Sequence, residues 1–214
     1  MATPDLLNLP PMLPCTQPLP FSHDEWLAEL KFDGYRVMAA TADEGARLQT
    51  KRGIDCTSWF PEVVSALSEL PAGHVFDGEI CVMDRLGHCN FEQVRARALH
   101  GGTFTGCDPV VFCVFDQLFD RGHDLRAWPL LDRKDRLKRA IAGAEPALMI
   151  VEGLPGDGHW LWRKAEELML EGIVLKRLDS VYQPGALSMD WVAVSRPGSA
   201  SERRKARGRA SLSA

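Results

Sequence analysis

The sequence has no long apolar run, and its first residues carry no export signal. A membrane-spanning helix needs about 18 or more consecutive apolar residues, and no segment of the 214-residue chain approaches that length. A secretory signal begins with basic residues and continues into an apolar block, a pattern that MATPDLLNLPPMLPC does not have. Both absences argue against a membrane partner and against export, so we expect a cytoplasmic protein.

The sequence also has no pair of cysteines in C-x-x-C spacing. Structural zinc sites usually take their ligands from such closely spaced pairs, so the spacing argues against a zinc ribbon. Scattered cysteines in a protein of this kind are typical of reduced cytosolic thiols. The six cysteines are Cys15, Cys56, Cys81, Cys89, Cys107 and Cys113.

A third absence is an excess of positive charge. The formal net charge is −4, whereas a domain that holds DNA tightly by itself is more often basic. The last stretch, SERRKARGRASLSA, is an exception because it is rich in arginine. We expect residues 199–214 to form a basic, disordered tail; a phosphate-binding arm is the alternative.

Proline and apolar spacing predict the arrangement of elements. Residues 1–20 contain six prolines, which lack amide donors and fix φ, so we expect an extended N-terminal segment. Helical spacing is present over 60–69, 91–99, 129–142 and 160–170. Strand patterns cover 26–40, with a hairpin or tight loop at Asp33-Gly34, then 46–53, a strand pair over 74–84, 109–119, 147–153, 171–178 and 189–196. Without regular βαβ alternation, the pattern indicates an α+β fold with mostly antiparallel sheets flanked by helices.

Lys31 lies in the segment Glu-Leu-Lys-Phe-Asp-Gly-Tyr-Arg, residues 29–36. A neutral lysine amine can attack the α-phosphorus of a nucleotide and form a phosphoramidate, but an ordinary lysine has a pKa of about 10.4. Glu29 and Asp33 share its strand face and favour the ammonium form, so a nucleophilic role needs a metal ion or arginines nearby. Alone, the segment fits a structural Lys–Asp ion pair equally well.

Five blocks in order carry a family resemblance. K-x-D-G-x-R at 31–36 resembles the first signature of covalent nucleotidyltransferases, which are DNA ligases, RNA ligases and mRNA capping enzymes. The blocks at 51–53, 76–79, 114–116 and 171–176 resemble the later signatures. The flanking stretches DGEICVMD, EGIVLKRLDSVY and DWVAVSRPG are most similar to bacterial ATP-dependent ligases of the end-joining type (ligase D). The resemblance implies an adenylation domain over residues 21–198, with the ATP-grasp-like fold of that superfamily.

The resemblance also implies roles for individual residues. Lys31 would be the nucleophile that becomes linked to AMP. Glu79 and Glu171 would bind Mg²⁺ or Mn²⁺, and Lys176 would reach the α-phosphate. The residues implied to bind ATP are Glu29, Arg36, Arg52, Glu79, Phe115 and Lys176.

Each residue also has a plainer interpretation. Glu79 could accept a ribose hydroxyl or a metal-bound water, but alone it resembles an exposed turn acid. Arg36 and Arg52 offer forks suited to ribose and phosphate oxygens, or they are surface arginines. Phe115 belongs to an apolar run that favours core packing, whereas the resemblance implies stacking on adenine.

The pair Glu171 and Lys176 poses a geometric problem. The two residues are five apart on one predicted strand, so in an ideal strand their side chains face opposite sides. A bulge or twist is needed if both are to reach one nucleotide.

The chain departs from the family pattern in two places. The fifth signature supplies a K-x-K pair, and here those positions hold Ala193 and Ser195. Losing a charge-assisted phosphate contact costs about 1.5–3 kcal/mol, or about ten- to a hundredfold in rate if the contact belongs to the transition state. Arg196 is a possible substitute, although it is one residue out of phase. In addition, we expect the oligonucleotide-binding (OB) barrel of complete ligases to be absent.

The sequence thus predicts the catalytic domain of an ATP-dependent DNA ligase acting on nicked or broken double-stranded DNA, with a separate OB-fold domain or end-joining proteins as further partners. A non-catalytic module that binds nucleotides or DNA ends is the first alternative, favoured by Ala193 and Ser195. An RNA ligase or capping guanylyltransferase is the second, and the flanking residues argue against it.

Overall fold

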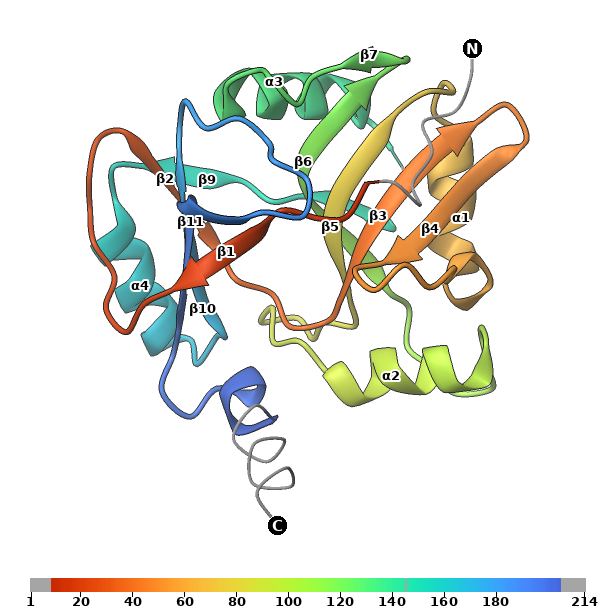
Figure 1. Ribbon diagram of the computed structural model, residues 1–214. Helices are drawn as coiled ribbons and strands as arrows, with labels where there is room; N and C mark the ends of the chain where they lie inside the picture. Colours follow the sequence, from red (N-terminus) through yellow and green to blue (C-terminus); the bar gives the residue numbers. More distant parts are fainter. Residues whose placement is uncertain (1–8, 145, 205–214) are drawn as a thin grey trace.

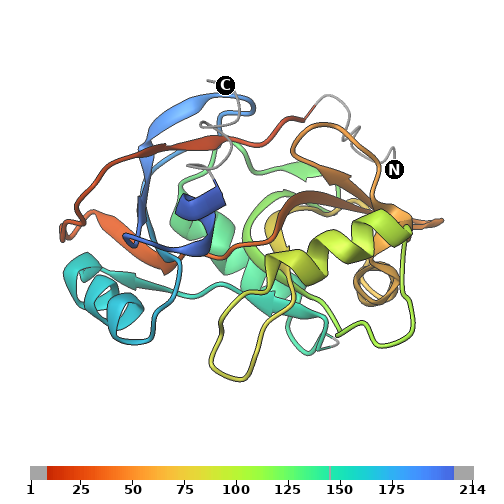
Figure 2. The same ribbon diagram turned by 90° about the horizontal axis from the view of Figure 1, so that it is seen from below.

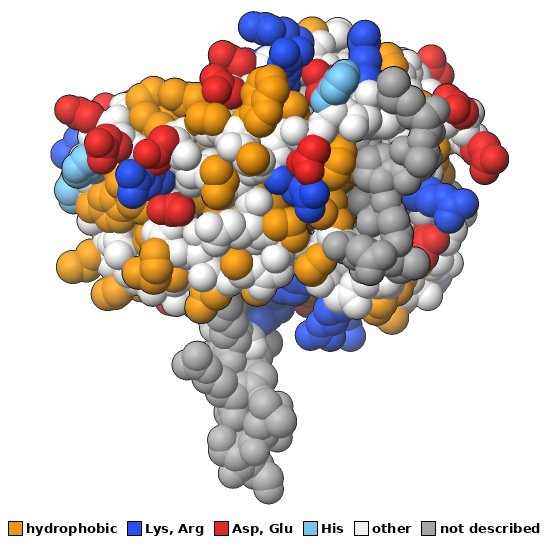
Figure 3. All heavy atoms as spheres, turned by 45° about the horizontal axis from the view of Figure 1, so that its top comes forward, with side chains coloured by type: hydrophobic (Ala, Val, Ile, Leu, Met, Phe, Trp, Pro, Cys, Tyr) orange, Lys and Arg blue, Asp and Glu red, His pale blue; other side chains and the backbone are white. Residues whose placement is uncertain are grey.

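The computed structural model describes residues 9–144 and 146–204. Within these residues the chain forms two sheets side by side, with helices on their outer faces (Figures 1 and 2). No helix among them is long and apolar enough to cross a membrane. On the face shown in Figure 3, Lys and Arg are interspersed with Asp and Glu. The described fold confirms the α+β prediction with mostly antiparallel sheets.

The first sheet has five strands in the order β1-β11-β10-β2-β9. All of its pairs are antiparallel except β1–β11. α4 covers one face, where Leu161 and Ala165 pack with Ile173 and Leu175. The elements are β1 (Leu13–Thr16), β2 (Trp26–Leu30), β9 (Gly153–Pro155), β10 (Gly172–Arg177), β11 (Leu187–Ser195) and α4 (Gly158–Glu167).

The second sheet has the order β4-β3-β5-β6-β7, and β8 pairs in parallel with β6. Apolar residues of α1 and α3 pack on it in the largest core cluster, which includes Leu67, Phe76, Phe112 and Leu137. The strands are β3 (Tyr35–Ala42), β4 (Gly45–Thr50), β5 (Val75–Cys81), β6 (Val111–Asp120), β7 (His123–Asp124) and β8 (Leu148–Ile150). The helices are η2 (Thr57–Trp59), α1 (Pro61–Ser68), α2 (Phe91–His100) and α3 (Leu130–Ala140).

The Asp33-Gly34 turn is not a hairpin. β2 pairs with β10 and β9 in the first sheet, while β3 pairs with β4 and β5 in the second. The loop 31–34 therefore crosses from one sheet to the other. It passes so close to β5 that a Cβ on Gly34 would lie 2.0 Å from the carbonyl oxygen of Ile80, which only glycine tolerates. The strand pair expected over 74–84 is also wrong, because β5 is a single strand followed by a bridge between Met83 and Cys89.

The described part of the N-terminal segment is extended, as predicted, but it belongs to the core. Leu9 and Met12 are buried with Tyr182 and Trp191, and β1 adds an edge strand to the first sheet. Residues 1–8 of that segment lie outside the described residues.

Candidate functional site

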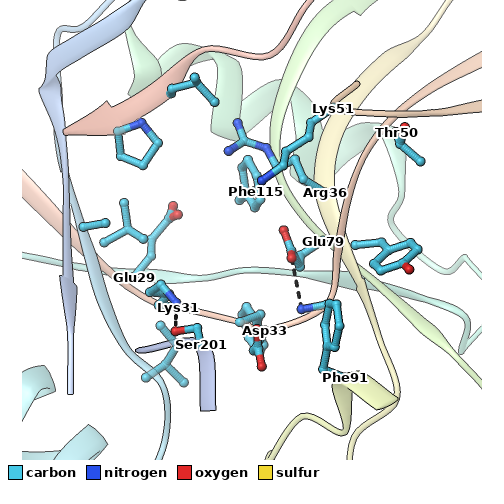
Figure 4. A pocket seen from close by; sticks show the side chains of 18 of the residues that line it. Glu29, Lys31, Asp33, Arg36, Thr50, Lys51, Glu79, Phe91, Phe115 and Ser201 are labelled. Atoms are coloured by element: carbon cyan, nitrogen blue, oxygen red, sulfur yellow. Dashed lines mark hydrogen bonds between the residues drawn. The ribbon is translucent and has the colours of Figure 1, made fainter. Parts of the chain in front are cut away.

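A cavity of about 720 Å³ opens between the two sheets (Figure 4). Side chains from β2, β10 and β11 line one side, and side chains from β3, β5 and β6 line the other. The crossing loop 31–34 also lines the cavity. Of the eight site residues predicted from the sequence, Glu171 is the one that does not line the cavity. The seven that do are Glu29, Lys31, Arg36, Arg52, Glu79, Phe115 and Lys176.

Lys31 follows β2 directly, and its amide donates to the Gly172 carbonyl at 3.0 Å. Its Nζ donates to Ser201 Oγ at 3.1 Å and lies 3.8 Å from Glu171 Oε2. The amine is thus held at the cavity wall by one hydroxyl, with one carboxylate at longer range.

Glu29 lies between two buried lysines. Its Oε2 is 2.6 Å from Lys176 Nζ, and its Oε1 accepts a hydrogen bond from Lys134. Lys134 also donates to the Val151 carbonyl at 2.8 Å. Sequence reasoning did not single out Lys134, which lies within the helix predicted over 129–142. The signal was present, because Lys134 shares the i, i+4, i+7 spacing of Leu130 and Leu137, the buried face of α3.

Burial lowers the pKa of Lys176 to about 8, and the charge of Lys134 acts in the same direction, while Glu29 opposes both. The Lys176 ammonium lies over two rings, 4.3 Å from the centroid of Phe115 and 4.2 Å from that of Trp191. Phe115 is half-buried and lines the cavity. Part of its ring therefore faces the cavity, which pure core packing would not allow, although the Arg36 guanidinium also lies over it, 4.7 Å from the centroid.

Arg36 is part of the cavity wall. Its guanidinium binds Asp77 through two hydrogen bonds of 2.7 Å and donates to the Met12 carbonyl at 3.0 Å. Tyr182 donates to the same Asp77 carboxylate at 2.6 Å. Arg52, in contrast, is an exposed residue at the cavity margin. The two arginines therefore differ in how freely they could meet a ligand.

Two carboxylates face the cavity on the side of the crossing loop. Glu79 Oε1 accepts from the Gly34 amide at 3.0 Å, and burial raises the pKa of Glu79 to about 7 against the charge of Arg36. Burial also raises the pKa of Asp33, opposed by its hydrogen bond with Arg204. Among the described residues, the buried Asp33 Oδ2 has no hydrogen-bond partner.

Glu171 reaches Lys31 without a bulge. β10 pairs in continuous register with both β11 and β2, and Glu171 lies just before the strand. Gly172 has φ 137° and packs so tightly that a Cβ would lie 2.1 Å from the Val194 carbonyl oxygen. The glycine turns the chain there, so strand parity does not apply to Glu171.

The chain beyond residue 198 is packed against this site. Residues 200–204 are helical, Ser201 is buried, and Ser201 and Arg204 both line the cavity. Residues 199–204 therefore do not form the disordered tail that their composition predicted. Residues 205–214 lie outside the described residues.

Comparison with known proteins identifies the family. The family model described as "ATP dependent DNA ligase domain" matches residues 15–194. The chain belongs to this family. The ligase resemblance seen in the sequence is confirmed, and the family description implies ATP as the nucleotide.

Individual relatives agree with this assignment. The SPbeta prophage-derived DNA ligase-like protein LigB of Bacillus subtilis is 34% identical over 184 residues, 86% of this chain and 66% of LigB. The multifunctional non-homologous end joining DNA repair protein LigD of Mycobacterium tuberculosis is 36% identical over 171 residues, 78% of this chain and 21% of LigD. A solved structure of mycobacterial DNA ligase D complexed with ATP and MES has a TM-score of 0.75 at 30% identity, covering 90% of this chain and 62% of that one. The chain thus spans about two thirds of LigB and about a fifth of LigD.

In this ligase domain the two positions of the missing lysine pair are not equivalent. Ala193 is buried, lines the cavity and pairs with Val174 on β10. Ser195 is at the end of β11 opposite Gly172. Arg196 does not replace either lysine, because its guanidinium donates to the Leu170 carbonyl at 2.8 Å and the Met169 carbonyl at 3.2 Å.

The oxygen donors of the cavity fit Mg²⁺ in part. The described residues contain no group of three or more His, Cys, Asp or Glu side chains that could hold a metal, but Mg²⁺ typically uses one or two carboxylates together with substrate phosphates. Glu79 and the unpartnered Asp33 Oδ2 are suitable donors. Both oxygens of Glu171 accept hydrogen bonds from Ala200 and Ser201, so metal binding there would have to displace these contacts.

Proposed function

We propose that this chain is the adenylation domain of an ATP-dependent DNA ligase in which Lys31 forms the covalent lysyl-AMP intermediate. The observation that carries the proposal is the position of Lys31 Nζ, at the wall of a cavity that also gathers six other residues singled out from the sequence. The volume of about 720 Å³ is within the range of small-molecule and cofactor sites.

The first step is nucleophilic. The lone pair of the neutral Lys31 amine forms a bond to the α-phosphorus of ATP, and the bond from that phosphorus to the bridging oxygen of pyrophosphate breaks. Lys31 must lose one proton to the solvent before it attacks and a second from the new N–P nitrogen. Lys176, already cationic near the ring of Phe115, would offset the charge that builds on the phosphate. Phe115 would provide aromatic surface for the adenine.

A bound Mg²⁺ or Mn²⁺ would neutralise phosphate charge and favour departure of pyrophosphate. Glu79 is the first proposed protein ligand, and Glu171, the second, would have to release Ala200 and Ser201 before it could bind the metal. Arg52, Arg36 and Glu29 complete the proposed nucleotide site. Of these, Glu29 and Arg36 act as fixed walls, because each is already bound to an oppositely charged partner.

The proposed substrate of the later steps is nicked or broken double-stranded DNA. AMP would pass from Lys31 to a 5′-phosphate, and the 3′-hydroxyl would then displace it to seal the strand. LigD is named as an end-joining protein, so we propose a role in DNA end joining or repair in the bacterial cytoplasm, with a separate OB-fold domain or end-joining proteins as partners.

Incubation with α-labelled ATP and Mg²⁺ tests the proposal. The expected result is an acid-sensitive protein adduct that Lys31→Ala abolishes and that labelled GTP does not form. A nicked duplex, with and without a separate OB domain, then tests sealing. Absence of any adduct would refute the ligase proposal for this chain.

A second candidate is a catalytically impaired module that binds nucleotides or DNA ends. The observation that favours it is Ala193, which places a methyl group in the cavity where the family carries a lysine. This candidate predicts that the chain binds ATP or a DNA end, as measured by fluorescence titration, but forms no adduct.

A further inference from the structure

The segment after β11 folds back beside the nucleophile. Residues 200–204 are helical and lie against the crossing loop 31–34, as the positions of Ser201, Lys31 and Asp33 show (Figure 4). Ser201 and Lys31 are 170 positions apart in the sequence. The contact is therefore a tertiary one that the sheets alone do not enforce.

Ser201 connects the reacting nitrogen of Lys31 to the carboxylate of Glu171. Its hydroxyl donates to Glu171 Oε2 at 2.7 Å and accepts from Lys31 Nζ at 3.1 Å. Only 9% of Ser201 is exposed. A neutral amine that donates one N–H to the Ser201 oxygen is held in a fixed orientation. Because the amine acts only as a donor in this contact, its lone pair remains free to form the N–P bond.

Arg204 attaches the same helical turn to the loop at a second point. Its guanidinium pairs with Asp33 and lies 4.0 Å from the centroid of the Phe91 ring. Residues three apart on a helix share a face, so Ser201 and Arg204 together span Lys31 and Asp33. Two attachments restrain the loop more than either alone, since rotation about one contact is blocked by the other.

Glu171 anchors the start of this turn. Its Oε1 accepts from the Ala200 amide at 3.0 Å, and its Oε2 accepts from the Ser201 amide at 3.3 Å. With the segment in place, the cavity still measures about 720 Å³, and Ser201 and Arg204 are among its lining residues. The segment therefore forms part of the wall and leaves the space for a nucleotide open.

We infer that Ser201 and Arg204 are positioning residues for adenylation: Ser201 orients the Lys31 amine, and Arg204 fixes the loop through Asp33. The inference rests on the proposed function and adds residues 199–204 to the site. Positioning of a nucleophile changes the rate of the chemical step more than it changes nucleotide binding.

The test measures single-turnover adenylation by α-labelled ATP in the full chain. Ser201→Ala should lower the maximal rate about ten- to a hundredfold, while the ATP concentration for half-maximal rate changes by less than about twofold. Ser201→Thr keeps the hydroxyl and should recover most of the rate. Arg204→Ala should lower the rate less, and Arg204→Lys should recover part of it.

Two controls accompany these variants. Arg203→Ala removes the same charge from the same turn, but Arg203 bonds the Gly198 carbonyl and not the loop. Ser65→Ala removes an exposed hydroxyl on α1. Both should retain the wild-type rate. Thermal melting of every variant identifies any loss of folding, and the Thr and Lys variants keep the test decisive if an alanine variant unfolds.

Hydrogen exchange of the peptide containing residues 31–34 supplies a readout independent of activity. Exchange should be faster in Ser201→Ala and Arg204→Ala than in Arg203→Ala. If the wild type forms no adduct, the proposed function fails, and unchanged hydrogen exchange in the variants would overturn the positioning inference as well.

If the wild type is active, an unchanged adenylation rate in Ser201→Ala overturns the positioning inference alone. A faster rate in Ser201→Ala also overturns it, because the segment would then obstruct the site.

Discussion

Two groups of charges border the cavity, and they differ in how far they are removed from water. The inner network consists of Glu29, Lys134 and Lys176, and the side chains of Glu29 and Lys176 are each only 2% exposed. The outer network consists of Lys31, Glu171 and Arg204, whose side chains are 17%, 11% and 33% exposed, together with the buried Asp33 and Ser201 that they contact. Buried charges are costly to leave unpaired, whereas partly exposed charges can be solvated when a partner is lost. Substitutions in the inner network should therefore affect folding, and those in the outer network should affect rate.

Glu29→Leu should have the largest effect. It leaves two buried ammonium groups, Lys134 and Lys176, without their shared carboxylate. Breaking a buried ion pair by removing one partner costs about 3–5 kcal/mol, and denaturant unfolding measures the loss. Glu171→Gln, in the outer network, should cost less by the same measurement, because Lys31 is partly exposed and water can solvate its ammonium. Equal losses in the two variants would contradict the division into two networks.

Lys176→Met should flatten the dependence of stability on pH above about pH 8. The folded-state pKa of Lys176 is about 8, below the ordinary value of 10.5, mainly because the side chain is buried. The unfolded chain therefore binds more protons between about pH 8 and 10.5, and the free energy of unfolding rises with pH in that window. The shift corresponds to a gain of at most about 3 kcal/mol.

Denaturant unfolding at several pH values between 7 and 10 measures this slope. Lys138→Met is the matched control, since Lys138 is a lysine of α3 whose exposed side chain pairs with Glu152, and it should keep the wild-type slope. A slope unchanged by Lys176→Met would show that the ammonium is already stabilised by Glu29 and by the two aromatic rings.

The sequence predicted the outer network less completely than the cavity as a whole. Ordered motifs were enough to place Lys31, Glu79 and Phe115 in one site, because each motif combines a special backbone position with a chemically specific side chain. Ser201 and Arg204 were not predicted, since serine and arginine in a polar, basic stretch are typical of tails and their contacts join residues 170 or more positions apart.

Topology was limited by a similar lack of long-range information. The elements over 61–68, 91–100 and 172–177 were predicted closely from apolar spacing. The Asp33-Gly34 turn signal was real, but a local turn cannot show whether its two strands pair with each other. Here β10 and β9 occupy both edges of β2, so β3 pairs elsewhere. That separation of β2 from β3 is what brings Lys31 into the space between the sheets.

Ala193→Lys with Ser195→Lys should raise the rate of adenylation. The side chain of residue 193 enters the cavity from β11, so an added ammonium there could contact the phosphates. A charge-assisted contact is worth about 1.5–3 kcal/mol, equivalent to about ten- to a hundredfold in rate. Labelled-ATP adenylation measures the gain. The single variants sharpen the prediction, because only residue 193 lines the cavity and should account for most of the effect. An unchanged rate would show that the other cations of the site already supply this charge.

Arg52→Ala should have the smallest effect, because this residue is exposed at the cavity margin. A solvated arginine contributes about 1 kcal/mol or less to a contact with a charged ligand, so the ATP concentration for half-maximal adenylation should rise by about two- to fivefold. The free energy of unfolding should not change. Arg36→Ala is the informative counterpart, since it leaves Asp77 buried and short of its bidentate partner and should lower the melting temperature. Equal destabilisation by Arg52→Ala and Arg36→Ala would show that exposure does not distinguish residues that stabilise the fold from residues that bind the ligand.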